Sequence, residues 1–454
     1  MKLGLKQHGD DYALQKVPES YKHWSWVSLF GVMLSITTAM FYFAWGGGLV
    51  LAYGTKDFFL AMVFGTIIIG SIGYFLVKIT SETALDTDLL TISSGFGFRG
   101  AGFTSLIYSV IFLMFFALEG TIMSQAVHTQ FPHLPLHLLY VFFGLVFIPL
   151  TWYGIKLMNY IMWITLPIYI TLVIPAIVRA SHTGAHIAFW SYTPTHATAP
   201  LAGPALLQLI SAVMALTVNA TVTGDVGRFI PKSQRKIATF MIGYVYEALT
   251  FMGAAMLGAW FALKLHQSNP GVYMPALLGI WGMFFVVVTQ LRINVLNTYS
   301  GSLSFSNFFA RAFNFRPGRQ WMVFLVAIIS TIFMFAGILA HLTQVLNFEA
   351  IFILAWIMAV ISDILINKRL LKLSPETYAI DKNKVPAFDP VGLTALALAL
   401  AISLPMVFNA LGPLWVTLAP FVSAAIAFVT PPLVAQALIR LKGLPPIVLA
   451  TSKR

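Results

Sequence analysis

The sequence contains no cysteine and few charged residues, and these two scarcities set the first limits. Without cysteine there is no disulfide, no thiolate nucleophile and no thiolate-bound metal. Charged residues make up 9% of the 454 positions, against roughly 25% in soluble domains, whereas 59% are hydrophobic. Such a chain has too little polar surface to stay dissolved as a globule, so lipid must surround it.

Chemistry-bearing motifs are also missing. Nothing resembles a phosphate-binding loop, a catalytic triad or a redox motif, and the ten histidines show no metal-ligand spacing on one helix. We therefore expect no enzyme, no cofactor and no metal site. The net charge of +12 does not indicate nucleic-acid binding, because the basic residues lie in short segments between apolar stretches. The expected partners are a small-molecule solute and the bilayer, and the sequence indicates no oligomeric state.

The apolar stretches predict an all-α integral membrane protein of about twelve transmembrane helices, since one span needs about 20 apolar residues. The expected spans are 26–53, 57–79, 103–127, 136–154, 157–179, 204–224, 237–265, 273–300, 321–341, 346–366, 391–410 and 414–437. The expected units are a cytoplasmic segment 1–25, spans 1–5 over 26–179, spans 6–10 over 204–366, spans 11–12 over 391–437, and a cytoplasmic tail 438–454.

Lysine and arginine predict the orientation. Of the 27 basic residues, 23 fall on one expected side, three fall on the other and Arg292 falls inside a span. Because cytoplasmic loops carry the excess of Lys and Arg, both termini should be cytoplasmic in a cell inner membrane. The polar N-terminus lacks a short hydrophobic region with a cleavage site, so no removable signal peptide is expected.

Two spans contain interruptions. Span 1 has Ala44-Trp45-Gly46-Gly47-Gly48, and glycine costs about 1 kcal/mol in a helix relative to alanine. Span 6 has β-branched and hydroxyl residues around Asn219, within residues 217–224. Interruptions five spans apart predict an inverted-repeat secondary transporter with its site near the midplane. The alternative is that these small residues allow close helix packing.

Three segments resemble the nucleobase:cation symporter family of cytosine permeases, purine permeases and hydantoin transporters. They are Trp45-Gly46-Gly47-Gly48 followed by Asp57-Phe58-Phe59-Leu60-Ala61, then Thr223-Gly224-Asp225-Val226-Gly227-Arg228-Phe229, then the run from Asn297 to Asn307. The resemblance covers residues 18 to 435 and identifies a divergent member. It implies the LeuT-type fold, with two inverted five-helix repeats and two extra helices.

Two charges lie inside spans and depart from the family pattern. Glu119 is in span 3 and Arg292 in span 8, and each costs roughly 2.5–3.5 kcal/mol at the centre of a bilayer. They predict an ion pair or a shared water-lined cavity; alternatively, each finds its own polar partner. The family's sodium site is expected at Arg292-Ile293, where a guanidinium would repel the ion. We therefore expect no sodium site, and Glu119 coupling to protons.

The resemblance also indicates the solute site. In the family, aromatic residues on spans 3 and 6 sandwich the base, and an ungapped alignment places Phe116 and Leu216 there, so one stacking face is lost. The other expected binding residues are Trp45, Gly46, Gly47, Glu119, Gly120, Asn219 and Asn294. Asp225 and Arg228 lie on adjacent turns and are expected to form a structural or gating pair. Other polar residues inside spans, such as Glu247, are more often interhelical bonds than ligands.

The sequence thus favours a secondary transporter of a nucleobase-like or related small polar solute that works by alternating access, proton-coupled or sodium-independent. The alternative is a transporter-like sensor domain that binds a solute without pumping it. An ion channel fits poorly, because no charged ring or filter-like repeat is present.

Overall fold

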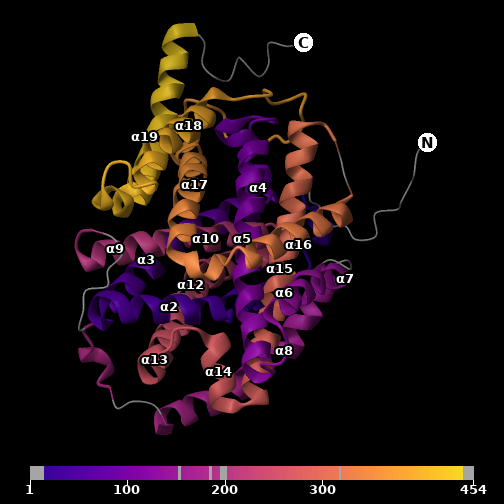
Figure 1. The fold of residues 1–454 in the computed structure, drawn as a ribbon. Coiled ribbons are helices and arrows are strands. Elements are labelled where there is room, and N and C mark those ends of the chain that lie inside the picture. Colours follow the sequence, from indigo (N-terminus) through magenta and orange to yellow (C-terminus); the bar gives the residue numbers. More distant parts are fainter. Residues whose placement is uncertain (1–14, 152–154, 184–186, 195–201, 316–317, 443–454) are drawn as a thin grey trace.

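The computed structural model describes residues 15–151, 155–183, 187–194, 202–315 and 318–442. Every regular element among these residues is a helix (Figure 1). The all-α class is therefore confirmed for this part of the chain. The expected terminal segments fall partly outside it, at residues 1–14 and 443–454.

The α-helices are α1 Trp26–Thr37, α2 Met40–Tyr53, α3 Thr55–Thr83, α4 Thr87–Thr91, α5 Ala101–Gln130, α6 Leu136–Leu145, α7 Phe147–Thr151, α8 Ile155–Thr183, α9 Ala205–Met214, α10 Thr217–Gly227, α11 Arg235–Phe240, α12 Tyr246–Ala248, α13 Met256–Leu265, α14 Pro270–Leu278, α15 Ile280–Ala312, α16 Arg319–Phe335, α17 Leu342–Ser362, α18 Pro390–Val407 and α19 Pro413–Lys442. The shorter 3-10 and π segments are η1 Glu19–Tyr21, η2 Ile92–Phe96, η3 Phe189–Ser191, η4 Lys232–Gln234, η5 Met241–Val245, η6 Leu249–Ala255, η7 Ile338–His341 and η8 Asp363–Leu370.

Nine helices of the described residues are long and apolar enough to cross a bilayer, and the bent pair α1 and α2 makes a tenth. Two shorter apolar helices, Leu136–Thr151 and Gln320–Phe335, coincide with the fourth and ninth expected spans. The protein is therefore a multi-pass membrane protein. The count of twelve, the cytoplasmic termini and the division into repeats stay predictions.

The eighth span begins and ends later than expected. The structure ends α14 at Leu278, turns at Gly279 with a φ of +59°, and then runs one helix, α15, from Ile280 to Ala312. At 1.5 Å per residue, 33 residues extend about 50 Å. The expected span 273–300 therefore merged a short separate helix with the first two thirds of a long one.

The centre of the bundle is built around α5 and α15, which pack against each other along much of their length. α2 packs on α13, and α10 packs on α3. α18 and α19 lie together beside α17 at the edge of the bundle (Figure 1). The bend between α1 and α2 thus faces helices that come from distant parts of the chain.

Candidate solute-binding site

The first broken helix bends at Thr38 and Ala39. α1 and α2 meet there at 48°, and Ala39 is extended, with φ −65° and ψ 136°. The Thr38 hydroxyl donates to the Leu34 carbonyl at 2.7 Å, so a side chain takes up a carbonyl of the last turn of α1. The break expected at 44–48 was wrong in position, because those residues lie inside α2.

The glycines of α2 have a packing role instead. A Cβ on Gly46 would lie 2.3 Å from the carbonyl oxygen of Ala255, and one on Gly47 would lie 2.8 Å from the Cβ of Ala262. Helix α2 therefore approaches η6 and α13 at backbone distance, which only small residues allow. Trp45 is 2% exposed beside them. A solute contact for these three residues stays a prediction.

The second interruption is a tight turn at Ala215 and Leu216. The Leu216 N–H donates to the Val213 carbonyl at 2.9 Å, and the Asn219 N–H donates to the Leu216 carbonyl at 3.0 Å. At this turn the backbone hydrogen bonds join residues three apart instead of four, so the helix tightens and its backbone groups keep their partners. The interruption expected over 217–224 was wrong in position, since that stretch belongs to α10.

Glu119 caps the half-helix that starts after the first bend. Its carboxylate accepts from the Phe41 N–H at 3.2 Å and from the Gln290 amide, while the Gln290 side-chain oxygen accepts from the Met40 N–H at 3.0 Å. The first N–H groups of a helix have no partner within it, and a negative charge is favoured at that end. Two helices far apart in the chain thus supply one cap each, Glu119 from α5 and Gln290 from α15.

Arg292 does not pair with Glu119. It is 0% exposed, and none of its three guanidinium nitrogens has a hydrogen-bond partner among the described residues. Gln290 and Asn294 bond to α5 from the same helix, whereas Arg292, two residues from each, points about 200° around the helix from both. Tyr169 of α8 is the titratable group that acts on it electrostatically. The predicted ion pair was therefore wrong.

The aromatic side chains of α5 that line the central cavity are not the one that the alignment indicated. The ring of Phe116 packs against Phe147 of α7, with centroids 5.3 Å apart. Phe112 and Phe115, which are three residues apart and so share a helix face, line the central cavity instead. Sequence reasoning missed these two rings because rotation of a helix about its axis depends on its packing.

Asn294 holds α15 against α5, and Gly120 of α5 lies close to Met334 of α16. The Asn294 amide donates to the Phe116 carbonyl at 3.3 Å, and its oxygen accepts from Asn297 at 3.1 Å. A Cβ on Gly120 would lie 3.1 Å from the sulfur of Met334. These residues lie behind the cavity wall, and Asn297 itself lines the cavity.

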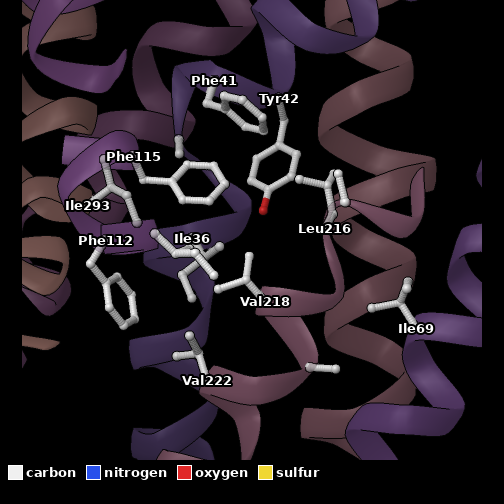
Figure 2. Close-up of a cluster of buried hydrophobic side chains, with 14 of the residues drawn as sticks. Ile36, Phe41, Tyr42, Ile69, Phe112, Phe115, Leu216, Val218, Val222 and Ile293 are labelled. Carbon is white, nitrogen blue, oxygen red and sulfur yellow. The ribbon is translucent and has the colours of Figure 1, made fainter. Parts of the chain in front are cut away.

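A central cavity lies at the bend, with an empty volume of about 370 Å³. It is lined by Ile36, Ala39, Phe41, Tyr42, Phe112, Phe115, Glu119, Val218, Asn219, Val222, Ile293, Leu296 and Asn297. Figure 2 shows the apolar side chains gathered here, with the Tyr42 hydroxyl pointing in among them and Leu216 beside it. The Tyr42 hydroxyl donates to the Asn219 side-chain oxygen at 2.8 Å. The site therefore joins flat aromatic surface to a few polar groups.

A second cavity, whose empty volume of about 810 Å³ includes space open to solvent, adjoins the first. Val222 and Leu296 line both, so the two spaces meet at these side chains. Polar groups of the second cavity include Asp86, Asp88 and Asn307. It lies between α1, α4, α10 and α15, on the side that the charge pattern predicts to be cytoplasmic.

Asp225 and Arg228 belong to a wider network in this second cavity. Arg228 forms an ion pair with Asp86 at 2.5 Å. The Asp225 carboxylate accepts from the Tyr108 hydroxyl at 2.7 Å and from the Thr87 N–H at 3.2 Å. Both residues therefore tie α10 to the segment around α4, and their expected role as a structural or gating pair stays a prediction.

Two further buried charges complete the network. Arg311 donates to Asp88 at 2.9 Å and to Ser105 at 2.8 Å, and the Asn307 amide also donates to Asp88. Sequence reasoning missed both aspartates. The available signal was Asp86-Thr87-Asp88, two acids in a short connection between spans 2 and 3 of a chain with 15 acidic residues in all.

Among known proteins, solved structures share this architecture. No family model and no curated protein matches the chain. Solved structures do: the nucleobase-cation-symport-1 family transporter Mhp1, closed with bromovinylhydantoin bound, superposes with a TM-score of 0.67 at 17% identity, over 90% of this chain and 92% of that one. The chain has the fold of Mhp1. Inward-facing Mhp1 gives a TM-score of 0.66 at 16% identity, over 90% of each chain.

A second transporter shares the fold. The substrate-bound, outward-open structure of a Na⁺-coupled sialic acid symporter gives a TM-score of 0.64 at 12% identity, over 95% of this chain and 93% of that one. The LeuT-type fold class implied by the family resemblance is thereby confirmed.

Proposed function

We propose that the protein is a secondary transporter, rather than an enzyme, that moves a small polar solute across a cell inner membrane by alternating access. The observation that carries this proposal is the central cavity at the bend between α1 and α2, which adjoins a second cavity through Val222 and Leu296. A site at a helix break near the midplane is typical of inverted-repeat transporters. The fold shared with solved closed, inward-facing and outward-open transporters supports the same function.

A planar heterocyclic solute suits the cavity best. Phe112, Phe115 and Phe41 provide ring faces, while Asn219 and Asn297 provide amide donors and acceptors. Mhp1 binds bromovinylhydantoin, which is also a ring with polar edges. We therefore place the chain, as a divergent member, in the nucleobase:cation symporter family, with a nucleobase, hydantoin or ureide as solute.

The coupling ion is proposed to be a proton rather than sodium. Arg292 brings a permanent positive charge to the part of α15 that the family uses for sodium. Glu119 holds the N-terminus of α2 through Phe41, so protonation of its carboxyl would weaken this cap and favour movement at the bend. Glu119→Gln keeps an acceptor for Phe41 but cannot titrate. Transport by this variant in proteoliposomes should lose the part of its pH dependence that Glu119 contributes; unchanged transport and unchanged pH dependence would overturn the role of Glu119.

A binding screen tests the proposal without assuming flux. Tryptophan fluorescence of the purified protein should report a higher unfolding temperature with cytosine, uracil, hydantoin or allantoin, since a bound ligand stabilises by mass action, and sodium should add nothing. Phe115→Ala should weaken binding by roughly 1–3 kcal/mol if the ring stacks on the solute. Phe103→Ala, at a position 54% exposed on the same helix, is the matched control and should bind normally.

Flux separates the transporter from the sensor alternative. Proteoliposomes loaded with an unlabelled hit should exchange it for the labelled compound outside. Saturable binding without any exchange would instead support a protein that senses the solute without moving it.

A further inference from the structure

Glu247 is a buried carboxyl group that the proposed site does not use. It lies in α12, a single short turn between the π segments η5 and η6. It is 0% exposed, and neither carboxyl oxygen has a hydrogen-bond partner among the described residues. π segments within helices occur frequently at functional sites. The sequence had favoured an interhelical bond for this residue, and the described residues supply none.

Among the described residues, Glu247 has no counter-ion. α12 packs against α1, which carries no titratable residue, and against the middle of α3, where residues 65–73 carry none. The charged residues of α3 and α10 lie in the end turns: Lys56, Asp57, Lys78, Glu82 and Asp225. Tyr42 of α2 and the adjacent Tyr246 are titratable side chains near Glu247.

One amide connects this carboxyl to the central cavity. The oxygen of Asn219 accepts from the Tyr42 hydroxyl at 2.8 Å, while its nitrogen has no partner among the described residues. The Asn219 amide also lies near enough to the Glu247 carboxyl to interact with it electrostatically, although no hydrogen bond joins the two groups. Asn219 and Tyr42 line the cavity, and Glu247 is outside its lining. Asn219 therefore has the cavity on one side and the carboxyl on the other.

We propose that Glu247 is a proton-binding site coupled to solute binding through Asn219. An ionised carboxylate without a partner inside the bundle is unfavourable, and one proton converts it to the neutral acid without needing a coordination shell. While ionised, Glu247 attracts the Asn219 N–H₂ donor; once protonated, it releases that donor to an acceptor on the solute. Proton and solute then favour each other's binding, and by linkage the effect is reciprocal.

This role differs from that of Glu119, whose carboxylate already accepts from Phe41 and Gln290. Glu119 acts on the bend of the helix, and Glu247 acts on the solute contact. The coupling, but not the proton site itself, rests on the proposed function.

The proton itself is the first probe. Infrared difference spectra of the purified protein in lipid, taken across a pH series, should show the C=O stretches of titrating, protonated carboxyls. Glu247→Gln should remove one component of this band. Glu349→Gln, which alters another buried glutamate whose two carboxyl oxygens have no partner among the described residues, and Glu119→Gln should both retain that component. A folded Glu247→Gln protein, judged by a monodisperse elution peak, that gives the wild-type spectrum would overturn the proposal.

Flux then tests the coupling, with cytosine, uracil, hydantoin and allantoin as probes. Glu247→Gln should exchange a probe at equal pH on both sides like the wild type, yet fail to accumulate it under an inward proton gradient. Asn219→Ala should keep the infrared component and lose the pH dependence of probe binding. Wild-type accumulation by Glu247→Gln would refute the coupling. Absence of exchange by the wild type would refute the proposed function and leave the infrared result standing.

Discussion

Alanine at two neighbouring glycines of α2 should have opposite effects on stability. A Cβ at Gly46 would lie 2.3 Å from the carbonyl oxygen of Ala255, whereas ordinary contact begins at 3.4 Å, so α2 and η6 must separate by more than 1 Å. The obstacle is backbone, and no side-chain rotation relieves it. A Cβ at Gly48 would meet no atom within 4 Å. The same methyl group is therefore added once into a packed interface and once into open space.

The expected magnitudes follow from these contacts. Overpacking at Gly46 should cost about 1–3 kcal/mol. Gly48→Ala should be neutral or stabilising by up to about 1 kcal/mol, because alanine favours the helix over glycine. The two variants should thus differ by about 1–4 kcal/mol. Thermal unfolding followed by the fluorescence of the 11 tryptophans suits a chain without cysteine, which thiol-reactive dyes cannot label. Equal unfolding temperatures for both variants would refute the packing role of Gly46.

Two further predictions concern charges on the side expected to be cytoplasmic. Asp86→Asn removes the charge from the buried 2.5 Å ion pair with Arg228 and should cost about 3–5 kcal/mol of folding stability. Glu82→Gln changes an ion pair with Arg369 that is about one third exposed, and it should cost less than about 1 kcal/mol. Similar losses of thermal stability in the two variants would contradict this. Burial raises the pKa of Asp389, the N-cap residue of α18, so its ionisation opposes folding. As pH rises through the raised native pKa, the wild type should become less stable than Asp389→Asn, which caps equally well; below the ordinary value of 3.8 the two should match. A stability difference that does not change with pH would refute the effect.

The position of the first bend shows the limit of reading helices from composition. Three consecutive glycines in span 1 predicted the interruption, yet Gly46 and Gly47 are helical because η6 and α13 press against them. The chain bends earlier because Glu119 and Gln290 accept from the first N–H groups of α2. These partners are 78 and 250 residues away along the chain, so no local pattern indicates them.

The rotation of a helix about its axis and the direction of its side chains could not be predicted from the sequence either. The alignment placed Phe116 in the site. In the structure, the rotation of α5 about its axis directs Phe112 and Phe115 into the cavity instead. Glu119 and Arg292 looked like partners because both are charges inside spans. In the structure Glu119 bonds to the start of α2, whereas Arg292 faces away from α5 and its guanidinium has no hydrogen-bond partner among the described residues.

The sequence by itself determined that this is a helical membrane protein, roughly where most of its spans lie, and which fold it resembles. Those properties depend on the length of apolar runs and on motif order, which are local. Only the tertiary structure decided where the helices break, which rings line the cavity and which buried charges have partners. Those properties depend on contacts between helices far apart in the chain. Among the described residues, Glu119 bonds at the helix bend and Glu247 has no hydrogen-bond partner.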